Sequence, residues 1–197
     1  MPSEMSYREL AHQQLRTLLL DTARALVVSG GWGRVRMSSV AASAGVSRQT
    51  LYNEFGSKEA LAQALVVRET ETFLRGVAAT LDNQAGSPRQ ALAGVVVYAL
   101  RSGGDAPLLK AILTSADNAL LPLLTTDVAP VLAAARGGIA DYLQREWPQA
   151  DAASTQRAAE WLTRLTVSYL AFSTAPAEQV GAELADLVGR YLDAAAH

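Results

Sequence analysis

The amino-acid sequence predicts an all-α protein, and three observations support this fold class. Half of the 197 residues are hydrophobic, which is enough to build a sizeable core for one large or two small domains. Alanine and leucine dominate and runs of β-branched residues are few, which favours helices over strands. Apolar residues recur at helical spacing in segments that glycine, proline or aspartate separate. We therefore expect a series of helices packed around an apolar interior.

The first helix is expected from about Ala11 to Ser29, after a short arm at residues 1–9. Gly30 and the glycine that follows it should end this helix. Trp32 should then fold back onto the core, because large aromatic side chains are mostly buried. The residues at helical spacing on the expected buried face are Leu15, Leu18, Leu19, Thr22 and Leu26.

Residues 38–61 contain the most informative pattern in the chain. Two short apolar-periodic segments flank Gly45, which can adopt the left-handed conformation that ends a helix. Ser47 suits the N-cap of the second segment, whose Leu51 and Phe55 share one face at i and i+4. A short helix, a tight turn and a second short helix with polar outward side chains predict a helix-turn-helix.

The same stretch is similar to a known family at several spaced positions. They are Val40-Ala41-x-x-Ala44-Gly45-Val46-Ser47, Leu51-Tyr52-x-x-Phe55 and Lys58-x-x-Leu61. Over about residues 12–65 the chain resembles the DNA-binding domain of TetR-family transcriptional repressors. The resemblance implies an N-terminal three-helix helix-turn-helix domain. It also implies a following helical domain that dimerises and encloses a small-molecule effector.

The resemblance and the polar side of the second short helix together select residues for DNA contact. Arg48 and Gln49 have the reach and donor geometry for base edges. Tyr52 resembles the family's tyrosine that contacts a phosphate, with partial packing inside the motif as the alternative. Ser38 or Ser39 could cap the first helix of the motif and leave its amides facing a phosphate. The expected DNA-contacting residues are Arg36, Ser38, Ser39, Ser47, Arg48, Gln49, Thr50, Tyr52, Asn53 and Lys58.

Basic charge gathers around this motif although the whole chain has a net charge of -2. Residues 1–58 hold seven Lys and Arg against four Asp and Glu, giving +3, and the rest hold ten against fifteen, giving -5. DNA affinity depends largely on neutralised phosphates, so the local charge matters more than the total. Arg36 stands where members of the resembling family often have threonine, and an arginine can itself bind a phosphate.

One long helix over residues 58–82 should link two domains, at residues 1–60 and 61–197. Residues 83–88 break this helix, and further helices follow. The Gly137-Gly138 pair inside one of them suggests a kink or the close approach of another helix. The expected ranges of these helices are 88–101, 106–118, 119–125, 127–147, 154–173 and 177–195.

The last two expected helices carry broad apolar faces. In the resembling family the corresponding pair forms a four-helix bundle with a second copy of the chain, which favours a homodimer. The alternative is that both faces only close the core of a single chain. The expected interface residues are Trp161, Leu165, Tyr169, Phe172, Leu184, Leu187, Val188 and Tyr191.

The middle helices are unusually apolar, and the resemblance implies that they enclose an effector. Such a site would take a small, mostly hydrophobic molecule, for example a fatty acyl chain, a terpenoid or an aromatic drug. A filled core without a cavity is the alternative, because lining and packing residues look alike in a sequence. The expected lining residues are Phe73, Val96, Tyr98, Leu100, Leu109, Ile112, Leu113, Asn118, Arg136 and Tyr169.

No set of residues in the sequence suggests catalysis. The two histidines, His12 and His197, lie far apart, and no Ser/His/Asp grouping, HExxH motif or phosphate loop is present. The lack of cysteine excludes disulfides and thiolate metal sites. No apolar run could span a bilayer, and the N-terminus lacks a signal peptide's apolar core.

We therefore expect a cytoplasmic protein that is not an enzyme and has no cofactor, metal or membrane contact. The sequence and the resemblance favour a ligand-responsive repressor that binds a palindromic double-stranded DNA operator as a homodimer. The alternative is a constitutive DNA-binding protein without a small-molecule effector. Operator release by added compounds would separate these two classes.

Overall fold

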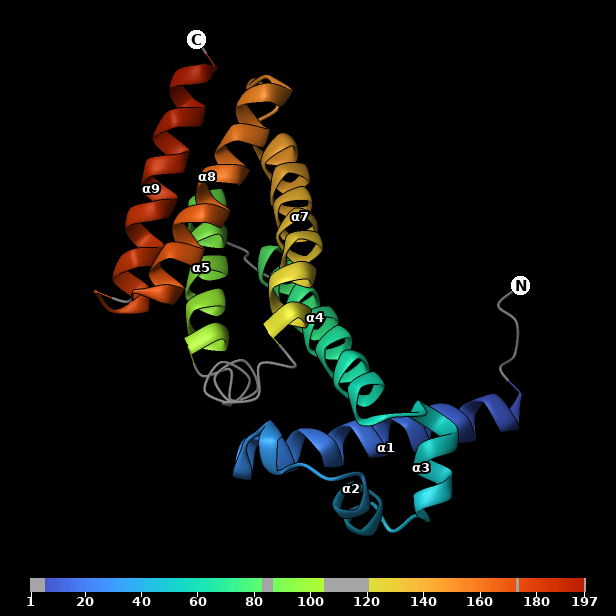
Figure 1. Cartoon of the computed structure of the whole chain (residues 1–197). Helices are drawn as coiled ribbons and strands as arrows, with labels where there is room; N and C mark the ends of the chain where they lie inside the picture. Colours follow the sequence, from blue (N-terminus) through green and yellow to red (C-terminus); the bar gives the residue numbers. More distant parts are fainter. Residues whose placement is uncertain (1–5, 83–86, 105–120, 173, 197) are drawn as a thin grey trace. The chain divides into compact units, whose positions relative to one another are not determined.

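The computed structural model describes residues 6–82, 87–104, 121–172 and 174–196, and all regular elements in these ranges are helical (Figure 1). This confirms the all-α fold class. The described residues divide into two compact units. The first contains residues 6–69 and 121–123, and the second contains the remainder. The division falls inside helix α4, between Glu69 and Thr70, and the domain boundary at residue 60 stays a prediction.

The first unit contains one long helix, three short elements and the start of a second long helix. In chain order they are α1 (Tyr7–Gly30), the 3-10 turn η1 (Trp32–Arg34), α2 (Met37–Ser43), α3 (Arg48–Phe55) and the first part of α4 (Lys58–Asp82). Helix α1 begins four residues earlier than expected because Ser6 and Glu9 form a capping box. The Ser6 N–H donates to Glu9 at 2.7 Å and the Glu9 N–H donates to the Ser6 hydroxyl at 3.4 Å.

The buried face of α1 differs in phase from the expected one. Leu18 is 47% exposed, whereas Leu19 and Leu20 are buried together with Ala23 and Val27. Three consecutive leucines leave the phase ambiguous, because each residue turns the helix by about 100°. The buried alanine and valine that follow set the face one residue later than predicted. Trp32 is 5% exposed, which confirms its expected place in the core.

The second unit packs the rest of α4 with α5 (Pro88–Gly104), α7 (Leu121–Glu146), α8 (Ala152–Ala171) and α9 (Ala177–Ala195). One apolar core joins all five helices, with members such as Val77, Leu92, Leu143, Leu162 and Leu192. From Leu121 onward, the two helices expected at 119–125 and 127–147 form the single helix α7. Only Thr126 lies between the two expected ranges, and threonine weakens a helix without ending it. The helix expected at 106–118 lies outside the described residues.

Small residues on α9 let α5 lie close to it. Gly181, Ala185 and Gly189 recur every four residues and are buried. A Cβ atom on Gly181 would lie 2.8 Å from the carbonyl oxygen of Ala93, so only glycine fits at this distance. In contrast, no described residue lies within 4 Å of a Cβ on either glycine of the Gly137-Gly138 pair. The close approach expected there is therefore not found among the described residues, and the alternative of a kink stays a prediction.

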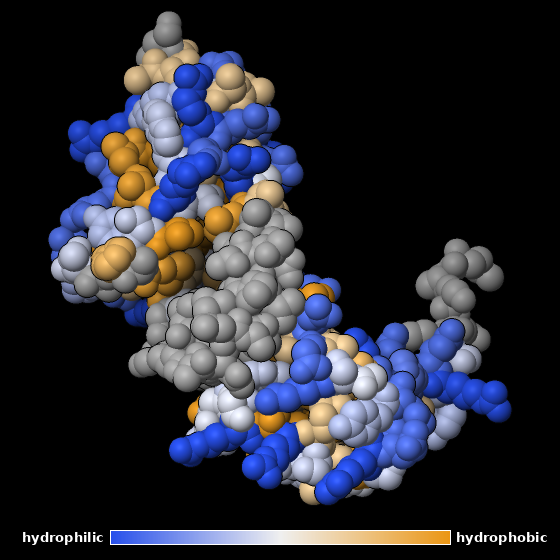
Figure 2. Space-filling view, viewed as in Figure 1, coloured by the Kyte–Doolittle hydropathy of each residue, from blue (hydrophilic) through white to orange (hydrophobic). Residues whose placement is uncertain are grey.

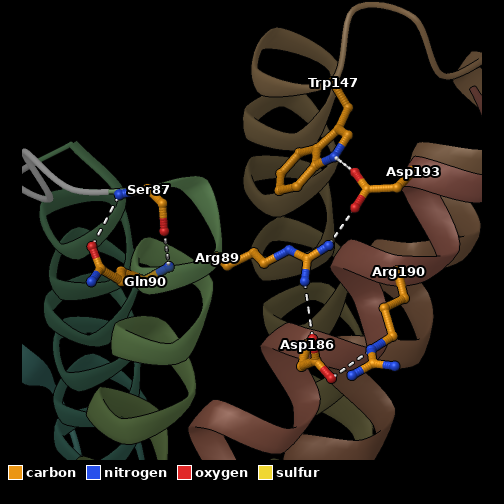
Figure 3. Close-up of polar contacts among 7 residues, drawn as sticks. All are labelled: Ser87, Arg89, Gln90, Trp147, Asp186, Arg190 and Asp193. Carbon is orange, nitrogen blue, oxygen red and sulfur yellow. Dashed lines mark hydrogen bonds and ion pairs between the residues drawn. The ribbon is translucent and has the colours of Figure 1, made fainter.

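A polar network joins one end of the same helices (Figure 3). Arg89 of α5 reaches across Gly189 to Asp186, at 3.0 Å, and to Asp193, both on α9. The indole N–H of Trp147, just after α7, donates to Asp193 at 2.9 Å. The network therefore ties α5, α9 and the end of α7 together.

Side-chain caps define the starts of two helices in this unit. Ser87 and Gln90 form a capping box at α5, with contacts of 3.0 and 3.4 Å (Figure 3). Asp151 caps α8, where the Ser154 N–H donates to its carboxylate at 2.8 Å and the Ser154 hydroxyl at 2.9 Å. These two hydrogen bonds, the backbone one first, lower the pKa of Asp151 below its usual value.

Candidate nucleic-acid interface

The turn between α2 and α3 has the conformation that the sequence predicts. Gly45 has a φ of +70°, in the left-handed region that glycine adopts without a Cβ clash. Ser47 precedes α3, and its hydroxyl oxygen accepts a hydrogen bond from the Thr50 N–H at 3.0 Å. Both predictions about this turn are confirmed, and together they fix where α3 begins.

Helix α3 has one apolar face and one polar face. Leu51 and Phe55 are buried, with 0% and 8% of their surface exposed. The opposite side consists of exposed residues, and hydrophilic residues cover much of the visible surface of this unit (Figure 2). Thr50 is half-buried between the two faces. The exposed residues of α3 among the expected DNA contacts are Arg48, Gln49, Tyr52 and Asn53.

Hydrogen bonds within α3 orient two pairs of its polar side chains. The Gln49 amide nitrogen donates to the Asn53 side-chain oxygen at 2.8 Å. The hydroxyl oxygens of Ser47 and Thr50 lie 2.8 Å apart in a second bond. Amide side chains held in this way present donors and acceptors of the kind that read base edges.

The start of α2 differs from the expected one. Arg36 is the N-cap residue, and no side chain caps the helix. Ser38 and Ser39 already lie in the first turn, so neither is the cap. The helix starts earlier because the extended backbone of Arg36 supplies its carbonyl to the N–H groups of Ser39 and Val40, at 2.9 and 3.1 Å. Arg36 and Ser39 are exposed and Ser38 is half-buried, and DNA contact by these three residues stays a prediction.

Lys58 at the start of α4 contacts the turn before α2. Its ammonium donates to the Trp32 carbonyl at 3.3 Å and lies 5.1 Å from the centre of the Trp32 ring. The phosphate contact expected of Lys58 stays a prediction, and the ammonium would have to share its donors with this carbonyl. Ser57 caps the same helix through the Ala60 N–H at 3.1 Å. Hydrogen bonds from its own backbone and from Ser57 lower the pKa of Glu59 in the first turn.

Sequence reasoning missed a polar cluster that joins α1 to α3. The Glu54 side chain is 6% exposed, and its carboxylate accepts a hydrogen bond from Arg16 at 2.7 Å. His12 Nε2 lies 2.8 Å from the other carboxylate oxygen. The Arg16 guanidinium also lies 4.8 Å from the centre of the Phe55 ring. The only signal in the sequence was the four-residue spacing of His12 and Arg16 on one face of a helix.

In the second unit the structure brings together part of the expected effector site. The rings of Phe73 and Tyr98 stack with their centres 5.7 Å apart. The Tyr98 ring lies against Gly76, where a Cβ atom would overlap the phenol. Leu100 and Tyr169 are also partly buried and pack against the same core.

Two other members of the expected effector site differ in exposure, and a lining role for both stays a prediction. Val96 is 0% exposed and is enclosed by the core. The Arg136 side chain is 51% exposed and pairs with Glu160 at 2.8 Å, because its position on α7 faces solvent. The pair lowers the pKa of Glu160, through hydrogen bonds from Arg136 and then Arg164. Expected lining residues outside the described ranges are Leu109, Ile112, Leu113 and Asn118.

The apolar faces of α8 and α9 divide into exposed and buried parts. Trp161, Leu187 and Phe172 are 39%, 52% and 78% exposed. The Tyr191 ring is half-buried and packs on Trp161 with ring centres 4.7 Å apart.

Two of the expected interface residues belong elsewhere. The interface role expected of Leu184 and Val188 is wrong, because these residues are 5% and 0% exposed and belong to the chain's own core. They point inward because they flank the small residues through which α9 meets α5. Leu165 and Tyr169 are half-buried, and an interface role for them stays a prediction.

The described residues contain neither a candidate metal site nor a membrane span. Among them, no three His, Cys, Asp or Glu side chains gather in a way that could hold a metal ion. No helix within the same ranges has the length and hydrophobicity needed to cross a membrane.

Comparison with known proteins places both parts of the chain. Residues 19–65 match the bacterial regulatory proteins of the tetR family, and residues 88–190 match the C-terminal domain of the bacterial tetracyclin repressor. The HTH-type transcriptional regulator AlkX of Mycobacterium tuberculosis is 34% identical over 184 residues, which cover 92% of this chain and 87% of that protein. The HTH-type regulator UidR of Escherichia coli is 37% identical over 62 residues, 32% of each chain.

Solved structures lead to the same family. The TetR-family repressor AlkX from a Dietzia strain, implicated in biodegradation of n-alkanes, is 30% identical with a TM-score of 0.67, covering 90% of this chain and 97% of that one. SmeT in complex with triclosan shares the fold at 21% identity, with a TM-score of 0.64 and coverage of 89% and 90%. The chain therefore belongs to the TetR family of bacterial transcriptional regulators, which are DNA-binding proteins and not enzymes.

Proposed function

We propose that this regulator is a repressor that binds a palindromic operator as a homodimer and leaves it when a small, mostly hydrophobic effector binds. The observation that carries the proposal is the exposed polar face of α3, which projects Arg48, Gln49 and Asn53 opposite the buried Leu51 and Phe55. A helix with this division of faces can lie in the major groove of DNA. A cytoplasmic location follows from the proposal, because bacterial DNA lies there.

In this proposal α3 reads the bases and its neighbours hold the phosphates. Arg48 can bind a guanine with two parallel hydrogen bonds, and Gln49 or Asn53 can do the same for an adenine. Tyr52, which is 47% exposed, has a hydroxyl suited to a phosphate oxygen. Lys58 adds positive charge to the same surface.

Binding measurements on two DNA duplexes test this assignment. The first duplex is selected from a random library by the wild-type protein, and the second is its scrambled version. Arg48→Ala should cost about 1–3 kcal/mol on the selected duplex and little on the scrambled one. Arg75→Ala is the matched control, because it removes the same charge from an exposed residue of the second unit. An equal loss on both duplexes would make Arg48 a phosphate contact.

The exposed aromatic and aliphatic residues of α8 and α9 support dimerisation. Trp161, Leu187 and Tyr191 form an apolar patch that extends from the chain's own core to its surface. Symmetric dimers are the commonest assemblies, and one half-site alone binds DNA weakly. In this proposal the two copies bind half-sites about one DNA turn apart.

Sedimentation of purified protein tests the dimer. The wild type should sediment at twice its 20.8 kDa mass at micromolar concentration. Leu187→Glu should shift the protein toward the monomer, because it places a charge in the patch. Ala134→Glu, on an exposed position of α7, is the control and should leave the mass unchanged. A wild-type monomer would contradict the proposal.

A hydrophobic effector is supported by the apolar character of the second unit and by one relative. The aromatic pair of Phe73 and Tyr98 lies half-buried beside a core built of aliphatic side chains. The relative from Dietzia is implicated in biodegradation of n-alkanes, which supports a long aliphatic chain among the ligand classes considered. Helix α4 begins at Lys58, shortly after the DNA-reading helix, and also contains Phe73 of the aromatic pair, so it is the proposed path between the two sites.

Release from DNA requires that the effector bind two conformations of the protein with unequal affinity. The effector must bind best to a conformation whose two recognition helices no longer fit successive major grooves, because equal affinity for both conformations would shift nothing. Anisotropy of the labelled selected duplex should fall when fatty acids, terpenoids or aromatic compounds are added. Release by charged polar metabolites alone would contradict a hydrophobic effector. No release by any compound would favour the constitutive alternative.

A further inference from the structure

We propose that Glu54 is a positioning residue of the recognition helix, and that His12 and Arg16 of α1 hold its carboxylate so that α3 presents its polar face at a fixed angle. Both carboxylate oxygens have a partner on α1, at 2.8 Å for His12 and 2.7 Å for Arg16. The two partners lie four residues apart and therefore on the same face of α1. The carboxylate thus joins two helices through Glu54 and Arg16, which lie 38 positions apart in the chain.

The burial of Glu54 distinguishes this cluster from an ordinary surface ion pair. Its side chain is 6% exposed, whereas those of His12 and Arg16 are 63% and 42% exposed. Burying a carboxylate is costly unless hydrogen bonds and opposite charges replace the lost water. The low-energy place for this carboxylate is therefore between its two partners, and any rotation of α3 that moved it away would leave it unpaired.

Helix α3 needs such a lateral contact because it is short. It has eight residues, and its only buried apolar side chains are Leu51 and Phe55. Two apolar side chains on one stripe fix the distance of a helix from its support but resist rotation about its own axis weakly. Glu54 lies beside that stripe, and the Arg16 guanidinium covers the Phe55 ring at 4.8 Å. The cluster therefore adds the contact that resists rotation.

The competing explanation is that Arg16 and His12 bind DNA phosphates and that Glu54 is incidental. The two explanations predict opposite changes in DNA affinity for Glu54→Gln, which keeps the shape of the side chain and removes its charge. Loss of a negative charge on a DNA-reading helix should strengthen binding to every duplex if only long-range electrostatics matter. Loss of the positioning contact should instead weaken binding to the selected duplex, because the base-reading side chains are no longer held in register.

The experiment measures affinity for the selected and scrambled duplexes across salt concentrations. It uses the full-length variants Glu54→Gln, Glu54→Ala, Arg16→Ala, Arg16→Lys and the double variant Glu54→Ala/Arg16→Ala. We expect Glu54→Gln to bind the selected duplex about tenfold more weakly while binding the scrambled duplex as well as or better than the wild type. Arg16→Lys, which keeps the charge, should recover part of the affinity that Arg16→Ala loses.

The double variant measures how much of the effect of Arg16 on DNA affinity depends on Glu54, which a purely structural defect would not change. If Arg16 acts through Glu54, removing Arg16 from the Glu54→Ala background should change the affinity for the selected duplex by less than about twofold. A phosphate-binding Arg16 would instead lower affinity for both duplexes in either background and reduce the salt slope by about 1. That result, or unchanged or tighter binding of the selected duplex by Glu54→Gln, would overturn the proposal. Circular dichroism checks that the variants are folded at the temperature used, and the isosteric Glu54→Gln remains decisive if Glu54→Ala unfolds.

The proposal rests on DNA reading by α3, and the two ideas fail in different ways. If the wild type enriches no sequence from the random library, the assignment of α3 fails before any variant is made. If it enriches a sequence and Glu54→Gln binds that sequence normally, only the role of Glu54 fails.

Discussion

The two units hold their helices together in different ways, and their arginine–carboxylate clusters show the difference most clearly. In the first unit a single carboxylate, Glu54, is 6% exposed and is shared by two basic side chains. In the second unit a single arginine, Arg89, is 37% exposed and is shared by Asp186 and Asp193, which are 45% and 53% exposed. Water screens all members of the second cluster, whereas in the first it reaches the basic side chains but hardly reaches the Glu54 carboxylate. The first cluster is therefore needed to keep a charge paired, whereas the second adds little to apolar packing.

The helix lengths explain why the units differ. Helices α2 and α3 have seven and eight residues, and they bury only three and two side chains. In the second unit, helices α5, α7, α8 and α9 have 17 to 26 residues and share one continuous core. Short helices are marginal by themselves and depend on caps and polar contacts at their ends. Long helices with wide apolar faces are stabilised mainly by burial.

The largest expected effect comes from the core of the second unit. Leu184→Ala should lower the free energy of unfolding by about 2–5 kcal/mol, because the side chain is 5% exposed and its loss leaves a cavity. Leu187→Ala, three residues later and 52% exposed, should change protomer stability by less than about 0.5 kcal/mol. Denaturant unfolding at several protein concentrations checks both. A cost for Leu187→Ala that grows with concentration would assign it to the dimer.

The two ion clusters can be compared directly by the same substitution. Arg16→Met leaves the buried Glu54 with one partner and should cost about 1–3 kcal/mol. Arg89→Met removes partly exposed pairs and should cost less than about 1 kcal/mol, because water can solvate both aspartates. Unfolding in urea, with and without added salt, measures both values. Equal costs would mean that burial does not separate the clusters.

Glycine substitutions test the claim that close packing holds the second unit together. Gly181→Ala should lower the free energy of unfolding by about 1–3 kcal/mol, since its Cβ would press on the Ala93 carbonyl oxygen at 2.8 Å. Gly137→Ala is the matched control in another helix of the same unit, because no described residue lies within 4 Å of its Cβ. It should stabilise the protein by about 0.5–1 kcal/mol, because alanine favours a helix. Thermal unfolding of the pair would contradict the claim if both changes had the same sign.

Local signals explain which features could be predicted from the sequence. The turn at Gly45, the cap at Ser47 and the inward Leu51 and Phe55 each depend on residues within one or two helical turns, and all are found as expected. The TetR family followed from the same local pattern, and the fold class followed from composition and helical periodicity along the chain. Features that depend on nearby residues can be predicted from the sequence, because backbone preferences and helical periodicity involve residues that are close in the chain.

Features that depend on distant residues could not be predicted. Leu18 was expected inside and Val188 was assigned to an interface, because periodicity gives a helix face but not its partner. The ion pair between Arg136 and Glu160 was not predicted either, because it joins two helices. The Glu54 cluster joins residues from two helices whose packing angle the sequence does not encode locally.

The smallest expected effect concerns the two helix caps, which have the same geometry but different chemistry. Ser47 caps α3 at 3.0 Å and Asp151 caps α8 at 2.8 Å. Ser47→Ala should cost about 1 kcal/mol at every pH, since a hydroxyl does not titrate. The folded-state pKa of Asp151 lies below its usual value of 3.8, so its contribution is complete above that value and disappears as the pH falls through the folded-state pKa. The melting-temperature deficit of Asp151→Ala should therefore be constant from about pH 5 to 8 and shrink below about pH 4, whereas that of Asp151→Asn, which keeps a neutral cap, should vary less. A deficit of Asp151→Ala that stays constant down to about pH 2 would mean that the charge of the cap contributes nothing.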